Sequence, residues 1–145
     1  MRLHDLFDFQ AREHPDIDFA VLGDRHVTFR EAAAEVNRLA NAFASAGLEV
    51  GDRVAILSKN SIEYAIVFYA ASKAGVVPVP MNYRLAAPEW VYIINDAGAK
   101  MLIGSAAYVS IVDGFRHELG SVKRFFAIDA DDPEGWDDYR SWIGK

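Results

Sequence analysis

The chain has 145 residues, of which 52% are apolar and 12% aromatic, so it is long enough to bury one core, and global disorder is excluded. Its 21 acidic and 15 basic residues give a net charge of −6, which argues against nucleic acid as a partner because an acidic surface repels a phosphate backbone. The absence of cysteine excludes disulfides, thiolate catalysis and cysteine-ligated metals.

Membrane insertion and export are not indicated. The longest apolar run, Tyr64 to Ala71, has eight residues, whereas a helix needs roughly 20 to cross a bilayer. Asp5 and Asp8 stand where a signal peptide would be apolar. We therefore expect no membrane span and a cytoplasmic protein.

A helix and a hairpin are predicted first. Apolar residues recur at helical spacing over the first 14 positions, and Pro15 ends the pattern. Two strand-like runs follow, Asp18–Leu22 and His26–Phe29, separated by residues 23–25. They predict a small β-hairpin.

A longer helix is predicted next. Thr28 is followed three residues later by Glu31, which is typical of a capping box, in which each side chain accepts a hydrogen bond from the other residue's backbone. Apolar residues then repeat every three or four positions. The helix should run for about five turns and end at Gly47.

The middle of the chain predicts a parallel pair of strands joined by a helix. Arg53–Leu57 lacks alternation and indicates a strand buried on both faces. Asn60 and Glu63 suggest an N-terminal cap for the helix Ile62–Ala74, which is apolar around most of its circumference and should expose an apolar face. The two prolines of Val76–Pro80 remove two backbone donors, which places them in an edge strand or at the end of their own strand.

The alternation of helix and strand then repeats. We expect a helix over Glu89–Asp96, a strand over Met101–Ile103, a helix from Tyr108 to Leu119 and a strand over Arg124–Ile128. Gly114 would lie inside the third of these elements. The expected fold is α/β, an open, mostly parallel sheet with helices on both faces, plus the small N-terminal helix and hairpin.

The last residues predict a loop and a packed aromatic face. Asp129–Glu134 is rich in acids and is interpreted as a solvated loop rather than a cation site. Trp136, Tyr139 and Trp142 are expected to pack as one helical face.

No catalytic or metal-binding motif is present. Neither GxGxxG nor GxxxxGK[ST] occurs, the serines lack GxSxG, and the four histidines lie in separate elements. The sequence therefore predicts no catalytic residue and no metal site. Lys59, after a strand and near a helix N-terminus, is either an anion-attracting group or a solvated lysine.

Three adjoining segments resemble a known family. They are GDRVAIL at 51–57, NSIEY at 60–64 and GVVPVPMNYRL at 75–85. In this order they are similar to the N-terminal part of the adenylate-forming enzymes, which include acyl-CoA synthetases, coumarate-CoA ligases, luciferases and peptide-synthetase adenylation domains. The segments most resemble the bacterial fatty-acyl-CoA synthetases. With the hairpin upstream and Glu89 and Lys100 downstream, the resemblance covers nearly the whole chain.

The resemblance implies an ATP-dependent, AMP-forming ligase that makes an acyl-adenylate from a fatty or other carboxylic acid and passes the acyl group to CoA. ATP, Mg²⁺ and CoA would be its cofactors, none bound tightly by this chain alone. Residues 1–145 would be the N-terminal subdomain, a fragment lacking the phosphate-loop, adenine-binding and C-terminal domains. Its partners would be those remaining subdomains, with a homodimer through exposed apolar surface also considered.

Two other functions remain open at this stage. One is a standalone flavodoxin-like or receiver-type binding domain, which would need an acidic group after a strand where Ser58 and Lys59 stand. The other is a non-catalytic interaction module.

The resemblance also suggests one binding site. In CoA-forming members the turn after the proline-containing strand lies near the entrance for the CoA thiol, which would place Asn82, Tyr83 and Arg84 there. Tyr83 offers a ring for adenine, and Arg84 could pair with phosphate. The alternative is structural: Asn82 caps the turn, and Arg84 bonds carbonyls to hold the loop.

Overall fold

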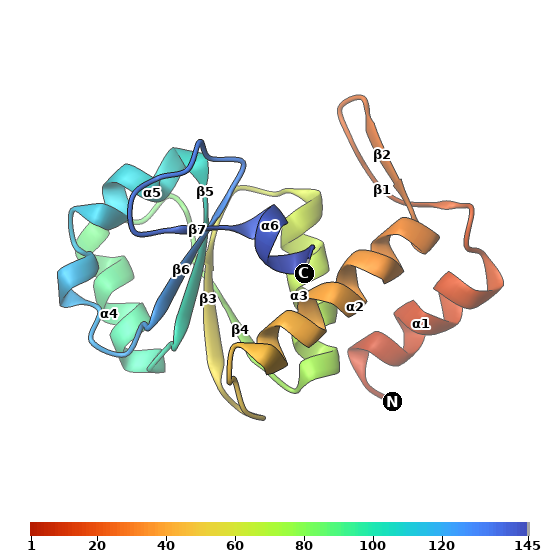
Figure 1. Ribbon diagram of the computed structural model, residues 1–145, viewed down its shortest axis with the longest axis horizontal. Coiled ribbons are helices and arrows are strands. Elements are labelled where there is room, and N and C mark those ends of the chain that lie inside the picture. Colours follow the sequence, from red (N-terminus) through yellow and green to blue (C-terminus); the bar gives the residue numbers. More distant parts are fainter. Residues whose placement is uncertain (145) are drawn as a thin grey trace. The chain divides into compact units, whose positions relative to one another are not determined.

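The computed structural model of the protein describes residues 1–144, which divide into two compact units (Figure 1). Residues 1–50 and 60–76 form the first unit, and residues 51–59 with the chain from Val77 onward form the second. The chain thus leaves the second unit after its first strand, contributes one helix to the first unit, and returns.

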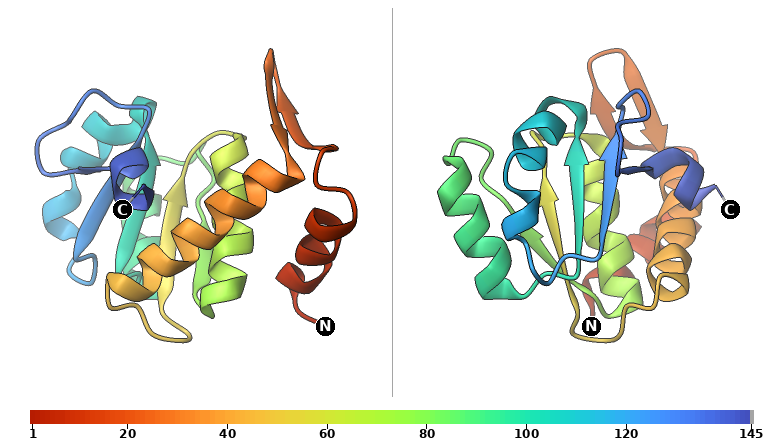
Figure 2. Two further views of the ribbon diagram at one scale, coloured as in Figure 1. Left: turned by 45° about the vertical axis from the view of Figure 1, so that its right-hand side comes forward. Right: turned by 60° about the vertical axis from the view of Figure 1, so that its left-hand side comes forward.

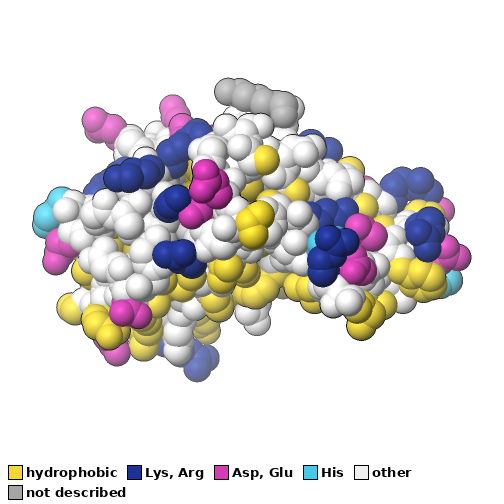
Figure 3. All heavy atoms as spheres, turned by 90° about the horizontal axis from the view of Figure 1, so that it is seen from below, with side chains coloured by type: hydrophobic (Ala, Val, Ile, Leu, Met, Phe, Trp, Pro, Cys, Tyr) yellow, Lys and Arg dark blue, Asp and Glu magenta, His cyan; other side chains and the backbone are white. Residues whose placement is uncertain are grey.

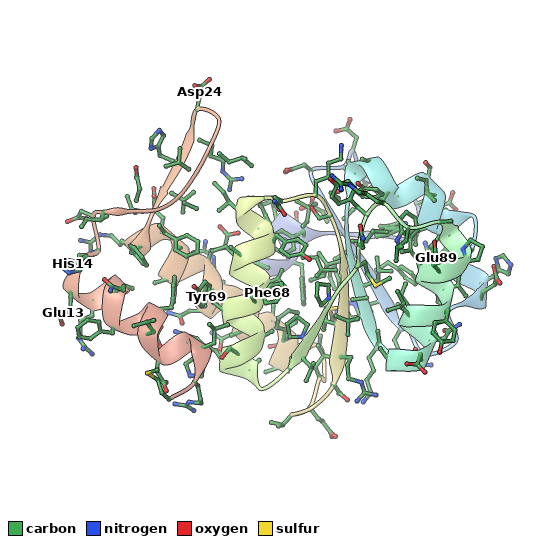
Figure 4. The ribbon with its side chains drawn as sticks, turned by 180° about the vertical axis from the view of Figure 1, so that it is seen from behind. Glu13, His14, Asp24, Phe68, Tyr69 and Glu89 are labelled. Carbon is green, nitrogen blue, oxygen red and sulfur yellow. The ribbon has the colours of Figure 1, made fainter. Side chains whose placement is uncertain are left out.

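The first unit holds three helices and a hairpin. These are α1 (Leu3–Glu13), β1 (Asp18–Leu22), β2 (Arg25–Thr28), α2 (Phe29–Ser45) and α3 (Ile62–Ala74). β1 and β2 pair antiparallel with Leu22 opposite Arg25, so the turn consists of Gly23 and Asp24, and Gly23 adopts a φ of +60° that suits glycine. The predicted hairpin is confirmed (Figure 4 labels Asp24 at its tip), although its turn is one residue shorter than expected and Phe29 begins α2.

An aromatic cluster joins the elements of the first unit. Phe7 of α1 stacks on Tyr69 of α3 with ring centroids 4.5 Å apart, and it meets Phe19 of β1 edge to face at 5.4 Å. Phe29 of α2 contacts Phe7 and Phe19 at 5.9 and 5.5 Å. Such ring pairs add about 0.5–1.5 kcal/mol each beyond the area they bury. The cluster therefore fastens α1 and the hairpin to α2 and α3.

The capping box at the start of α2 is confirmed. The Thr28 backbone N–H donates to the Glu31 carboxylate at 2.8 Å, and the Glu31 backbone N–H donates to the Thr28 hydroxyl oxygen at 3.3 Å. The backbone N–H and the hydroxyl of Thr28 both donate to the Glu31 carboxylate, and these two hydrogen bonds hold the pKa of the Glu31 carboxyl below its usual value. The local sequence thus fixes where α2 begins.

Helix α3 differs from the prediction in two ways. Its N-cap is Ser61, whose hydroxyl accepts from the Tyr64 N–H at 3.1 Å, whereas Glu63 is buried and pairs with Arg25 of β2 at 2.6 Å. No residue of Ile62–Ala74 is exposed, because α1 and α2 pack against this helix. The prediction of an exposed apolar face on α3 is therefore wrong. Burial does raise the pKa of the Tyr64 hydroxyl.

The second unit is built on a five-stranded parallel sheet. Its strand order is β4 (Val77–Pro80), β3 (Arg53–Leu57), β5 (Met101–Ser105), β6 (Arg124–Ile128) and β7 (Asp137–Asp138). β4 is an edge strand, which is one of the two alternatives that its prolines left open. Figure 2 shows β3, β5 and β6 running in the same direction. This order is also that of flavodoxin-like sheets, so topology alone does not separate the two fold families.

Helices cover both faces of this sheet, as predicted. On one face, Leu57, Leu102 and Phe125 belong to a core that includes Trp90 of α4 (Ala87–Ala97) and Val112 of α5 (Ala106–Asp113). On the opposite face, Trp142 of α6 (Tyr139–Ile143) stacks on Phe126 with ring centroids 3.8 Å apart. The second unit therefore has its own buried core.

Two predictions for the C-terminal third are wrong. The helix after β5 ends at Asp113, and a separate 3₁₀ turn, η1 (Arg116–Glu118), follows, because Gly114 terminates the helix instead of continuing it. Trp136 and Trp142 also lie on opposite sides of the sheet, since they contact Phe125 and Phe126, neighbours whose side chains point to opposite faces of β6.

Candidate functional site

The carboxyl edge of the parallel sheet brings together the segments that follow β3 and β4. Leu57 is followed by Ser58 and Lys59, and Pro80 is followed by Met81. The Met81 N–H donates to the Ile56 carbonyl at 2.9 Å, which continues the β3–β4 ladder beyond the last assigned strand residue. Open α/β sheets bind ligands beyond the carboxyl ends of their strands, so this edge is where a site is expected.

The turn after β4 is held by Asn82. Its side-chain oxygen accepts from the Arg84 N–H at 3.0 Å, which is an Asx turn. Its backbone carbonyl accepts from the Leu85 N–H at 3.2 Å and from the indole N–H of Trp90 at 2.9 Å. Trp90 is buried, so it anchors the turn to the core. Asn82 therefore caps the turn, which is the structural alternative that the sequence left open for it.

This turn exposes Arg84 to solvent, whereas Tyr83 packs with part of its surface against the core of the second unit. The Arg84 guanidinium carbon lies 5.4 Å from the centroid of the Tyr83 ring, and Arg84 is exposed while Tyr83 is half-buried. Within residues 1–144, no hydrogen bond or ion pair of the Arg84 side chain is found. The expectation that Arg84 holds the loop through carbonyls is therefore not met, and its guanidinium is open to a ligand.

Lys59 belongs to the same cluster. Its ammonium nitrogen lies 5.7 Å from the Tyr83 ring centroid, a cation–π contact, and the residue is exposed. The sequence marked Lys59 as a possible anion-attracting group but gave no sign that it meets Tyr83, because the two residues are separated by a helix in the chain. The carboxyl edge thus carries one aromatic ring with two cations beside it.

The other polar groups considered in the sequence do not form a site. Among residues 1–144, no three histidine, aspartate or glutamate side chains are grouped so that they could hold a metal ion. Asp129 and Asp132 adopt positive φ values of 54° and 39° in the acidic loop after β6, where both are exposed. None of the helices within the described range is long and apolar enough to span a membrane.

Comparison with protein families gives a match over most of the chain. The model of the AMP-binding enzyme family matches residues 7–142. The long-chain-fatty-acid–CoA ligase FadD13 of Mycobacterium tuberculosis is 42% identical over 110 residues, which cover 74% of this chain and 22% of that protein. The fatty acid–[acyl-carrier-protein] ligase ScoC of Streptomyces coeruleorubidus is 36% identical over 105 residues, which cover 72% of this chain and 20% of ScoC.

A solved structure has the same fold. The anthranilate CoA ligase AuaEII, solved in complex with anthranoyl-AMP, superposes with a TM-score of 0.95 and 26% identity over 99% of this chain and 28% of that one. The chain therefore spans between a fifth and about three tenths of the length of these three relatives.

Proposed function

Because the chain belongs to the family of AMP-binding enzymes, we propose that it is the N-terminal subdomain of an AMP-forming ligase that activates a carboxylic acid, foremost a fatty acid, and transfers it to CoA. The observation that carries this proposal is the family match over residues 7–142. The fold shared with a CoA ligase supports it. Because the relatives are several times longer, the phosphate-loop, adenine-binding and C-terminal domains are proposed to lie in further parts of the protein.

The proposed reaction has two steps. A carboxylate oxygen attacks the α-phosphorus of ATP and pyrophosphate leaves, which gives an acyl-adenylate. The thiol of CoA then attacks the acyl carbon, its proton is released, and AMP leaves. Both steps need donors around developing negative charge and a site from which water is excluded.

The described residues do not fit a site for ATP and Mg²⁺. No group of acidic or histidine side chains within residues 1–144 suits a metal ion, and the sequence has no phosphate loop. These two cofactors are therefore assigned to the rest of the ligase, and no catalytic residue is proposed in this chain.

The described residues do suit the entrance for CoA. The turn at Asn82 is fixed by its own hydrogen bonds and by Trp90, so Tyr83 and Arg84 are presented in one geometry. Tyr83 would stack on adenine, and the Arg84 guanidinium would pair with a phosphate oxygen. Prior ordering of the turn reduces the entropy lost when CoA binds.

The full-length enzyme is also proposed to self-associate through exposed apolar surface. Figure 3 shows hydrophobic side chains among charged ones on the face of the protein that it draws. The face of α1 that carries Leu3, Leu6 and Phe9 is exposed at these residues by 53%, 57% and 47%. This face is proposed as the contact of a homodimer in a cytoplasmic enzyme. Light scattering at high protein concentration tests it: a strict monomer contradicts the dimer, and Leu6→Asp should abolish a dimer that does form.

ATP–pyrophosphate exchange tests the activity itself. The full-length protein should catalyse exchange with at least one member of a panel of fatty and aromatic carboxylic acids. The 145-residue chain alone should stay at background because it lacks the groups that bind the triphosphate. Exchange by the isolated chain, or no exchange by the full-length protein with any acid, would overturn the proposal.

A further inference from the structure

Within residues 1–144, strand β4 pairs with β3 on one side and with no strand on the other, which we call its outer side. The Val77 N–H donates to the Asp52 carbonyl at 2.8 Å, and the Met81 N–H donates to the Ile56 carbonyl at 2.9 Å. Backbone groups of successive strand residues point to alternate sides, so positions 77, 79 and 81 face β3. Positions 78 and 80 therefore face the outer side.

Both positions that face the outer side are prolines, Pro78 and Pro80. Proline has no backbone N–H, and its ring occupies the place of that hydrogen. Over the length of β4, the outer side thus offers carbonyl oxygens but no donor. A further strand would find only half of the usual hydrogen bonds there, and the two rings would hold it away.

The order of the residues matters as much as their presence. The two valines of β4 stand at the positions that face β3, where a backbone N–H is needed, and Val79 also packs against the core of the second unit. If prolines and valines were exchanged, β4 would lose its donors to β3 and gain donors on the outer side. The alternation of valine and proline therefore gives β4 one side that pairs and one side that does not.

The opposite end of the sheet is protected in another way. β7 consists of only two residues, both acidic: Asp137 pairs with Arg124 at 2.8 Å, and Asp138 caps α6. A very short strand and charged side chains both disfavour pairing with a further strand. β4 has four residues and no charge, and its Val77 is 45% exposed, so only its prolines give it such protection.

We infer that Pro78 and Pro80 close the outer side of β4 to strand addition by a second copy of this chain. An unpaired apolar strand is a template for such pairing, because two identical strands related by a two-fold axis supply each other with donors and acceptors. The inference concerns assembly and goes beyond the proposed ligase activity. It restricts self-association to surfaces other than this side of the sheet.

The test replaces both prolines, Pro78→Val with Pro80→Val, in the full-length protein. The double variant gains two outward donors and keeps both side chains apolar. Its apparent molar mass in light scattering should at least double relative to the wild type as the concentration rises. In dilute solution the amides introduced at positions 78 and 80 should exchange rapidly with deuterium, and association should slow their exchange on the order of tenfold.

Pro133→Val is the matched control. Pro133 lies in the acidic loop after β6, outside any strand, so its replacement restores a backbone N–H without adding a donor to the sheet. This variant should keep the wild-type mass at every concentration. Pro80→Val alone supplies one outward donor and should associate more weakly than the double variant, which keeps the inference testable if the double variant does not fold.

Val79→Pro tests the assignment of the two sides. It removes a donor that faces β3 and should lower the melting temperature, whereas the double variant should melt close to the wild type and retain ATP–pyrophosphate exchange when dilute. A melting temperature unchanged by Val79→Pro would show that the sides are assigned wrongly and would overturn the inference.

The remaining outcomes are equally decisive. A folded double variant that keeps the wild-type mass at all concentrations overturns the inference, as does equal association by Pro133→Val. Protection of the introduced amides in dilute solution also overturns it, because another part of the protein would then already cover the outer side of β4. Association that slows exchange only in other segments has the same consequence. Loss of exchange activity in the wild type would contradict the proposed function and leave this inference standing.

Discussion

The amino and carboxyl edges of the parallel sheet differ in how their charged side chains are paired. At the amino edge, Asp52, just before β3, pairs with Lys100, just before β5, and Arg124 pairs with Asp137. At the carboxyl edge, Lys59 and Arg84 lie beside the Tyr83 ring and form no ion pair within the described residues. Charges at the first edge hold the unit together, and charges at the second are available for binding.

The largest expected effect comes from the core between the two edges. Phe126→Ala removes a fully buried ring and its stack on Trp142, and should lower the free energy of unfolding by about 3–5 kcal/mol. Urea denaturation measures it. Adenylation and thiol transfer should decline together as folded protein is lost, which is the pattern that a variant at the carboxyl edge must not show.

The amino edge should respond in stability alone. Lys100→Met withdraws the ammonium that lies 2.8 Å from Asp52, whose carboxylate is largely buried, and should cost about 1–3 kcal/mol of stability. The Michaelis constants of the folded full-length enzyme should stay at their wild-type values. A raised KM for CoA in this variant would break the distinction between the edges.

The carboxyl edge should respond in binding alone. Arg84→Ala should raise the KM for CoA by roughly tenfold, which corresponds to loss of one charge-assisted phosphate contact. The adenylate-forming half-reaction does not involve CoA and should be nearly unchanged. If both half-reactions and the melting temperature fall together, Arg84 is structural and its assignment to the CoA entrance is wrong. Arg124→Ala, at the amino edge, is the comparison variant.

The smallest expected effect is on the pH dependence of the free energy of unfolding, through the N-cap of α6. The Asp138 carboxylate caps α6 by accepting from the Ser141 N–H at 2.6 Å, and this hydrogen bond lowers the pKa of Asp138 below 3.8. The stabilisation is therefore complete above the ordinary pKa and is lost as pH falls through the lowered value. Asp138→Asn keeps a capping oxygen but cannot titrate.

Thermal unfolding between pH 5 and about pH 2 measures this difference. Relative to the wild type, the Asn variant should lose less stability over that range because its cap is unaffected by protonation. A variant with the same pH slope as the wild type would show that Asp138 does not contribute. Glu31, whose pKa is lowered by Thr28 in the first unit, should contribute in the same direction in both proteins.

Local rules accounted for most helix and strand positions. The capping box at Thr28, the uninterrupted apolar strand at Arg53–Leu57 and the strand with two prolines were all predicted, because each depends on neighbouring residues. The cap of α3 was misassigned, since Asn60 and Ser61 are both good caps and only the backbone geometry selects Ser61. The two-residue strand β7 has no apolar pattern and was missed.

The sequence by itself determined the order of the elements, the parallel arrangement and the resemblance to a ligase family, because hydrophobic periodicity and short motifs act over a few residues. The tertiary structure alone decided that Lys59 meets Tyr83 and that Lys100, 48 residues from Asp52, pairs with it. Such contacts between residues distant in sequence depend on strand order and register, because these determine which loops share an edge of the sheet. The site at the carboxyl edge is a product of that arrangement.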